Sequence, residues 1–242
     1  MFQATERIAA VVAVALITLT GCAPSSTASS SAECPNSPLV SSVYLDATAS
    51  SMSDDYADLV SRIATRTASC EGMLAVSTFG ESSGQTVTLL DQSFVVEAPT
   101  DNAKKRKRQK LAEDVAATVR DKFVAAAADT PSSATDVIGI LRLISEAQAQ
   151  HPDAVHEATL ATDGATNVGV DPAAASSKEA ALALAEQVEV PDLSGVHLTF
   201  AGIGRTTSPM SSAIVEQISV FWERVCERTN ASSCTVATQW RG

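Results

Sequence analysis

Two kinds of hydrophobic pattern alternate along most of this chain. Short runs that are almost continuously apolar, such as 39–46 and 73–79, are typical of strands buried on both faces of a sheet. Longer segments in which apolar residues recur every three or four positions, such as 136–150 and 211–228, predict helices with one buried face. The alternation predicts a protein in which strands and helices follow one another.

The full pattern predicts a doubly wound α/β fold. Strands are expected at 39–46, 73–79, 85–96, 158–162, 196–203 and 234–240, and helices at 53–68, 102–127, 136–150, 173–189 and 211–228. Only the short segment 81–84 separates the second strand from the third, which predicts a hairpin and an antiparallel edge strand. We therefore expect a mostly parallel six-stranded sheet with helices on both faces, a three-layer sandwich.

The first residues differ from the rest of the chain. Arg7 precedes an apolar stretch, 8–19, which is shorter than a membrane-spanning helix and is typical of a secretory signal. The stretch ends in Leu-Thr-Gly-Cys at Cys22 and resembles a bacterial lipobox, in which cleavage precedes a lipid-carrying cysteine. We expect residues 1–21 to be a lipoprotein signal peptide, with Cys22 carrying acyl chains such as palmitate. The alternative is an ordinary secretory signal with an incidental cysteine.

The segment that follows predicts a tethered domain. Residues 22–38 are rich in Ser, Ala, Thr and Pro and have almost no bulky apolar side chains, so we expect a flexible linker. Residues 39–242 are long enough for one sizeable core and predict a single domain. A lipid anchor would place this domain at the cell membrane, on its extracytoplasmic face.

Cysteine usage predicts two disulfides. With Cys22 assigned to lipid, four of the five cysteines remain. Cys226 and Cys234 are close in sequence. Cys34 and Cys70 each precede a predicted strand, and these two strands should be neighbours in the sheet. We expect the pairs Cys34–Cys70 and Cys226–Cys234. The alternatives are free buried thiols, or a zinc site, which is disfavoured because no CxxC spacing occurs.

The charge balance excludes some partners. A net charge of −11 argues against nucleic-acid binding, which needs a basic surface, and against general adhesion to anionic lipid. The exception is a basic cluster at 104–110, near the start of a predicted helix. This cluster could contact anionic lipid or a cell-wall polymer, but a solvated helix face is the interpretation that we favour.

Three small polar clusters follow or precede the predicted elements at one edge of the sheet. They are Asp46-Ala-Thr48-Ala-Ser50 after the first strand, Thr135-Asp136 ahead of a helix, and Thr162-Asp163-Gly after the fourth strand. Hydroxyl and carboxylate oxygens are hard ligands that suit Mg²⁺ or Mn²⁺. Ligands in open α/β sheets bind just outside the carboxyl ends of the strands. The spacing therefore predicts a divalent-cation site there.

These motifs resemble those of the von Willebrand factor type A (VWA) domain, a Rossmann-like fold with a metal-ion-dependent adhesion site (MIDAS). The family motifs are Asp-x-Ser-x-Ser, Gly-Gly-Thr-Asp and Thr-Asp-Gly, and this chain has Asp46-x-Thr-x-Ser, Ser-Ala134-Thr-Asp and Thr-Asp163-Gly in that order. The turn Ala-Gly202-Ile-Gly204 also resembles a glycine-bearing turn of the family. The resemblance covers about residues 39–240.

The resemblance implies a binding module and not an enzyme. Thr48 and Ser50 would ligate the metal through their hydroxyls, Thr135 directly or through water, and Asp46 and Asp163 mainly through bound waters. One open coordination position would accept an acidic side chain of a protein partner. The alternatives are a metal-independent scaffold lipoprotein with a degenerate site, and a metal-dependent hydrolase, for which no convincing general base or nucleophile is evident.

Overall fold

The computed structural model describes residues 33–51, 56–129 and 133–240. From Cys34 onward they belong to one compact unit. The expected signal peptide, the expected lipidation site Cys22 and most of the expected linker 22–38 lie outside the described residues.

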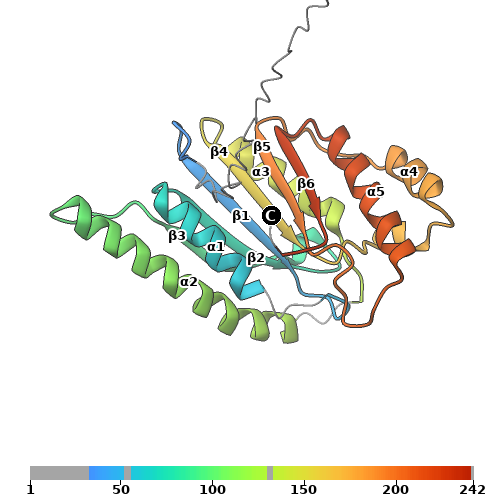
Figure 1. The fold of residues 1–242 in the computed structure, drawn as a ribbon, viewed down its shortest axis with the longest axis horizontal. Helices are drawn as coiled ribbons and strands as arrows, with labels where there is room; N and C mark the ends of the chain where they lie inside the picture. The colour runs from blue at the N-terminus through green and yellow to red at the C-terminus, as the bar shows by residue number, and fades with distance from the viewer. Residues whose placement is uncertain (1–32, 52–55, 130–132, 241–242) are drawn as a thin grey trace, which may run out of the picture. The chain divides into compact units, whose positions relative to one another are not determined.

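The described chain builds one six-stranded sheet in the order β3-β2-β1-β4-β5-β6 (Figure 1). The strands are β1 (Leu39–Asp46), β2 (Met73–Phe79), β3 (Val87–Ser93), β4 (Val155–Ala161), β5 (Val196–Ala201) and β6 (Ser233–Ala237). Only β2 and β3 pair in antiparallel fashion, and every other neighbouring pair in the sheet is parallel. The predicted fold class, a doubly wound α/β sheet with one antiparallel edge strand, is confirmed.

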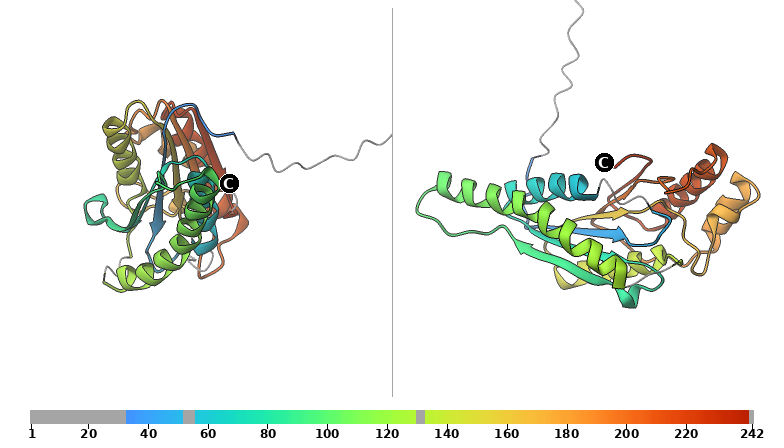
Figure 2. Two further views of the ribbon diagram at one scale, coloured as in Figure 1. Left: turned by 90° about the vertical axis from the view of Figure 1, so that its left-hand side faces the viewer. Right: turned by 90° about the horizontal axis from the view of Figure 1, so that it is seen from below.

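Helices cover both faces of this sheet (Figures 1 and 2). They are α1 (Tyr56–Ser69), α2 (Asp101–Asp129), α3 (Val137–Gln150), α4 (Lys178–Gln187) and α5 (Ser212–Arg228). Alternate residues of β1 supply two separate cores: Val43 and Leu45 pack with α1 and α2, while Tyr44 packs with α3, α4 and α5. The period-two alternation of a strand thus joins the two helical layers.

Some boundaries differ from the sequence prediction, for local reasons. The helix expected from residue 173 begins at Lys178, because Ser177 caps it and Asp171 caps a separate 3₁₀ turn, Pro172–Ala174. The strand expected to reach residue 240 ends at Ala237. Trp240 instead leaves the sheet and packs edge-on against Tyr56, with ring centroids 5.0 Å apart.

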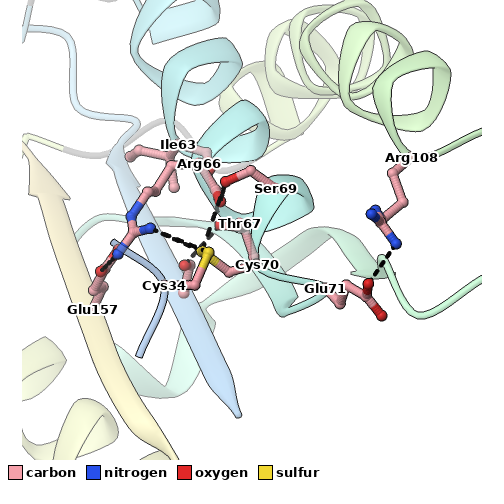
Figure 3. Close-up of a disulfide and its surroundings, with 10 residues drawn as sticks. Cys34, Ile63, Arg66, Thr67, Ser69, Cys70, Glu71, Arg108 and Glu157 are labelled. Carbon is pink, nitrogen blue, oxygen red and sulfur yellow. Dashed lines mark hydrogen bonds and ion pairs between the residues drawn. A yellow bond between two sulfur atoms is a disulfide. The ribbon is translucent and has the colours of Figure 1, made fainter. Parts of the chain in front are cut away.

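Two disulfides join elements near the ends of the strands. They are Cys34–Cys70 and Cys226–Cys234, the pairing expected from the sequence. Figure 3 shows the first of them beside Arg66, whose Nη1 lies 2.8 Å from Cys70 Sγ. This disulfide links the segment before β1 to the turn between α1 and β2, so it fastens the point where the chain enters the domain.

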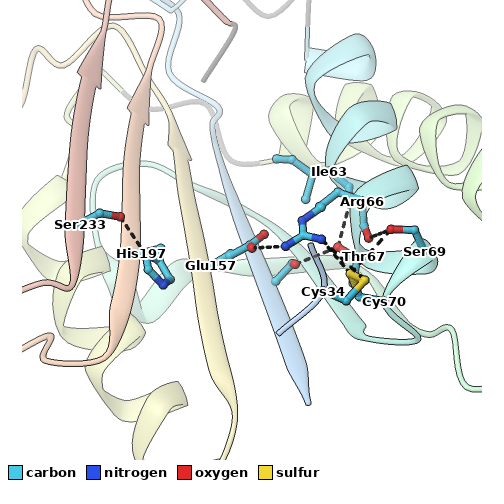
Figure 4. Close-up of polar contacts among 10 residues, drawn as sticks. Cys34, Ile63, Arg66, Thr67, Ser69, Cys70, Glu157, His197 and Ser233 are labelled. Atoms are coloured by element: carbon cyan, nitrogen blue, oxygen red, sulfur yellow. Dashed lines mark hydrogen bonds and ion pairs between the residues drawn. A yellow bond between two sulfur atoms is a disulfide. The ribbon is translucent and has the colours of Figure 1, made fainter. Parts of the chain in front are cut away.

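The face of the sheet that α1 covers also carries polar side chains on β4, β5 and β6. Glu157 of β4 forms an ion pair with Arg66 of α1 at 3.4 Å, and His197 of β5 lies 2.8 Å from the Ser233 hydroxyl of β6 (Figure 4). Glu157, His197 and Ser233 occupy one row across the sheet because they are register partners. This polar row lies nearer the amino ends of β4 and β5, whereas Ala161 and Ala201 on the same face, nearer the carboxyl ends, are buried in the core. In the described part of the chain, no helix is both long and apolar enough to cross a membrane.

The two disulfides are expected to stabilise the fold unequally. Cys34 and Cys70 are separated by 36 residues, whereas Cys226 and Cys234 are separated by 8. Loop-closure entropy predicts that the substitutions Cys34→Ala and Cys70→Ala together lower the free energy of unfolding by about 4 kcal/mol. The corresponding loss for Cys226→Ala with Cys234→Ala is about 2.5 kcal/mol. Urea denaturation of the two double variants measures both losses, and an equal or reversed order would contradict this prediction.

Candidate metal centre

The structure brings the three polar clusters together at the carboxyl ends of β1 and β4. These strands are parallel neighbours, and Leu45 pairs with Ala161. The residues that follow, Asp46 and Thr162, are therefore side by side, and the Thr162 hydroxyl donates a hydrogen bond to Asp46 Oδ2 at 2.7 Å. The third cluster reaches the same place through the Thr135 hydroxyl, 3.4 Å from Thr48 Oγ1.

Asp46 organises the loop that follows β1. Its Oδ1 accepts hydrogen bonds from the Thr48 backbone N–H at 2.9 Å and from the Thr48 hydroxyl at 2.6 Å. Both oxygens of the carboxylate are thus satisfied by the protein, although the side chain is almost completely buried. Because the Thr48 hydroxyl gives its proton to Asp46, its lone pairs are left for another partner.

Three hydroxyls gather around Thr48. Its Oγ1 lies 3.3 Å from Ser50 Oγ and 3.4 Å from Thr135 Oγ1. Adjacent ligands of an octahedral Mg²⁺ are about 3.0 Å apart, since each metal–oxygen bond is about 2.1 Å. The two spacings exceed that value by only a few tenths of an ångström. The hydroxyls are therefore close to the separation that a small hard cation requires.

The Asp163 carboxylate is the group in this cluster that best fits a role in cation binding. Its side chain is fully buried, and Oδ1 accepts a hydrogen bond from the Ala165 N–H at 2.8 Å. Its Oδ2 is also buried but has no hydrogen-bond partner among the described residues. A buried carboxylate oxygen without a partner costs free energy unless a cation or ordered water satisfies it. The donor set present is therefore suitable for a divalent metal with bound waters.

Burial and mutual repulsion change the acidity of both carboxylates. Burial raises the pKa of Asp46 from its usual value of 3.8 to about 7, with a further contribution from the negative charge of Asp163. Hydrogen bonds from Thr48 and Thr162 oppose this rise. Burial also raises the pKa of Asp163. The Ala165 N–H and the Ser50 hydroxyl oppose this rise. A bound cation would favour the ionised form of both groups.

The loop that presents Thr135 is fixed by its neighbours. The Asn167 side chain accepts a hydrogen bond from the Thr135 N–H at 2.8 Å, and the Thr166 hydroxyl donates to the Thr135 carbonyl at 2.8 Å. Asp136 is directed elsewhere, because its carboxylate caps α3 by accepting the Gly139 N–H at 2.8 Å. Asn167 and Thr166 were not predicted, since nothing in the sequence marks residues that act through backbone contacts.

Tyr56 is a second residue that the sequence did not reveal. Its hydroxyl lies 3.1 Å from the backbone carbonyls of both Asp46 and Ala161, and 2.9 Å from the Ser51 hydroxyl. Tyr56, the first residue of α1, therefore bridges the carboxyl ends of β1 and β4 next to the candidate site. Burial, together with the charge of Asp46, raises its pKa well above the usual value, so it stays a neutral donor.

The glycine-bearing turn after β5 holds the site from another side. The Gly204 N–H donates to the Asp163 carbonyl at 2.8 Å, and the Thr207 N–H donates to the Ser50 carbonyl at 2.9 Å. Gly202 has a φ of +93°, and a Cβ atom there would lie 2.4 Å from the Trp240 ring. Glycine is needed at this position for both the backbone conformation and the packing of Trp240.

A hollow of about 700 Å³ opens beside the cluster. Asp46, Thr48 and Thr207 line one side, and Phe123 and Ala127 of α2 line the other. Ser50, next to the hollow, is exposed. In the described residues no three His, Cys, Asp or Glu side chains gather in a metal-binding group. The candidate site thus consists of two carboxylates and several hydroxyls, a set suited only to hard cations.

Fold and site together define a doubly wound α/β protein with an oxygen-rich polar cluster at the carboxyl edge of its sheet. Neither a protein-family model nor a curated protein matches the sequence. Among solved structures, the chain is similar to BatB from Bacteroides thetaiotaomicron, with 12% identity, a TM-score of 0.45, and coverage of 83% of this chain and 90% of that one. It is also similar to an aerotolerance-related membrane protein from Bacteroides fragilis NCTC 9343, with 8% identity, a TM-score of 0.40, and coverage of 82% and 90%.

The raised pKa of Asp46 predicts an unusual pH dependence in the presence of a chelator. Because its pKa is about 7 in the folded protein and 3.8 in an unfolded chain, the folded protein binds the extra proton between these values. The contribution of Asp46 to stability therefore increases as the pH falls through about 7 towards 4. Urea denaturation midpoints at about pH 5.5 and about pH 7.5 test this, and Asp46→Asn should reduce the difference between them. A difference that is unchanged in Asp46→Asn would contradict the assignment.

Proposed function

We propose that this protein is a VWA-like binding module that holds Mg²⁺, or Mn²⁺, at a MIDAS-like site and uses it to bind an acidic side chain of a protein partner. The buried Asp163 Oδ2, which has no hydrogen-bond partner in the described part of the chain and accompanies three clustered hydroxyls, is the single observation that carries this proposal. The ordered sequence motifs support the same site.

Each site residue would have a distinct role. The hydroxyls of Thr48, Ser50 and Thr135 would hold the metal, and the carboxylates of Asp46 and Asp163 would neutralise its charge, mainly through bound water. When bound, the metal would supply a positive charge and an open coordination position for a carboxylate of the partner. Ser50 is exposed and Thr48 lines the open hollow, so a partner can approach from that side.

A binding role fits these residues better than catalysis. The hydroxyl of Thr48 is already hydrogen-bonded to Asp46, and both Asp46 oxygens accept hydrogen bonds. No histidine or cysteine belongs to the cluster in the described part of the chain. A metal-dependent hydrolase would need a positioned base or nucleophile, and neither Asp46 nor Thr48 is free for that role.

We further propose that the module is held at the extracytoplasmic face of the cell membrane by lipid on Cys22. The lipobox-like sequence before Cys22 supports this anchor. The two disulfides support an oxidising compartment, since disulfides persist mainly outside the cytosol.

One observation favours a second candidate, a metal-independent scaffold. Asp46 is completely satisfied by Thr48 and Thr162, so this part of the site holds its shape without a cation. In that case the partner would bind the same edge through ordinary polar contacts.

Metal binding is tested by titrating Mg²⁺ and Mn²⁺ into the purified protein by calorimetry. We expect binding in the millimolar range or tighter, and a thermal stabilisation that grows with metal concentration. Asp163→Asn should weaken binding about tenfold or more, because it removes the charge that faces the metal. The matched control is Asp153→Asn, an exposed aspartate outside the site, which should leave the titration unchanged. Absence of millimolar binding by the unaltered protein would reject the metal proposal.

Partner binding is tested separately by cross-linked capture from intact cells. We expect the same partner to be recovered in Mg²⁺, to be lost in EDTA, and to be lost with Asp163→Asn even when Mg²⁺ is present. Equal recovery of that partner in Mg²⁺ and EDTA would favour the metal-independent scaffold.

A further inference from the structure

No residue in the first turns of α2 is fully buried. The buried residues of this helix begin at Ala112, although the helix begins at Asp101. Figures 1 and 2 show that this end of α2 projects past the sheet. A helix segment that is polar all round has no core to stabilise it, so its surface must be explained by local pairs or by something that it contacts.

The projecting end of α2 concentrates positive charge in a protein that is acidic as a whole. Segment 104–110 contains six of the 17 Lys and Arg residues of a chain whose net charge is −11. Arg108 pairs with Glu71 and Lys110 pairs with Asp114. No ion pair with a described residue occurs for the remaining four, which are Lys104, Lys105, Arg106 and Lys107. We call these four residues the basic end of α2.

A solvated helix face does not account for this arrangement by itself. The two i,i+4 pairs near the basic end, Lys110 with Asp114 and Gln109 with Glu113, stabilise the turn that follows it. The four cations themselves are consecutive, and like charges three or four positions apart on a helix repel one another. An external anionic surface would remove that repulsion.

The basic end lies at the edge of the sheet opposite the candidate metal centre. Arg108 donates to Glu71 at 2.7 Å, and Glu71 follows Cys70, which is bonded to Cys34 (Figure 3). Cys34 precedes β1 and Glu71 precedes β2, so both mark the amino ends of the strands. The Cys34–Cys70 disulfide and the ion pair of Arg108, the residue that follows the basic end, thus connect this part of α2 to the point where the chain enters the domain.

We propose that the basic end of α2 binds the anionic headgroups of the membrane to which the protein is anchored, and that the candidate metal centre consequently faces away from the membrane. The proposed anchor at Cys22 is what brings this edge close, since the residues between Cys22 and Cys34 span roughly 40 Å at most. A hollow of about 470 Å³ lies beside the basic end and offers space for a headgroup; Lys105, Arg108 and Ser69 line it, together with Glu113, whose carboxylate accepts a hydrogen bond from Gln109.

The test uses vesicles and a chain without lipid. The chain from residue 23 onward contains the whole compact unit that begins at Cys34, and EDTA keeps the measurement independent of the metal proposal. We expect it to co-sediment with vesicles of phosphatidylglycerol and phosphatidylcholine at low salt, but not with phosphatidylcholine alone. Raising the salt to about 0.5 M should abolish binding, because exposed charges are then screened.

Two charge-matched double variants isolate the surface. Lys105→Gln with Arg106→Gln should weaken vesicle binding roughly 25-fold, at about fivefold per charge. The control is Arg120→Gln with Arg142→Gln, which removes the same charge from exposed positions elsewhere and should change binding less than about twofold. Equal losses in the two variants would show a bulk-charge effect and overturn the proposal. Equal binding to both kinds of vesicle, or binding to an isolated anionic wall polymer but not to vesicles, would also overturn it.

Discussion

The burial of two carboxylates at the ends of adjacent parallel strands is the constraint on which the candidate site depends. Asp46 and Asp163 are both removed from water, and their charges repel each other. The protein compensates unequally: Asp46 receives three hydrogen bonds from Thr48 and Thr162, whereas Asp163 Oδ2 receives none from the described residues. This asymmetry makes one carboxylate part of the framework and leaves one oxygen of the other available for a ligand. The proposed metal role follows from that difference.

The framework around these carboxylates is held by groups from distant parts of the chain. Tyr56 bridges the ends of β1 and β4, and the turn after β5 fastens both Ser50 and Asp163 through backbone hydrogen bonds. Trp240 packs against Tyr56 and occupies the space that Gly202 leaves open. Because these contacts are buried and mutually dependent, the site is held rigidly from below and from one side. Such support is what a binding site needs to hold its hydroxyls in place before a ligand arrives.

The periodic patterns were sufficient to predict the fold, because strands buried on both faces and one-sided helices have distinct spacings. Grouping Asp46 and Asp163 at one edge followed from the rule that parallel strands end on the same side, whereas Thr135 was assigned to the same site by the resemblance to the family motifs. The roles of Tyr56 and Asn167 could not be predicted in this way, since each depends on backbone groups that only the tertiary fold brings close. Strand β6 ends earlier than predicted, and Trp240 packs against Tyr56 instead of continuing the strand. Local sequence propensity does not encode this long-range contact.

Helix α2 relates the two proposed surfaces of the molecule to each other. Its 29 residues correspond to a length of about 43 Å. Its first turns carry the basic end at the amino edge of the sheet, and Phe123 and Ala127 near its other end line the hollow beside the candidate metal centre. Between them, Val115 and Val119 are buried against the sheet, so the helix cannot rotate without disrupting the core. If its basic end is held on a bilayer, the same helix therefore fixes the direction in which the hollow faces.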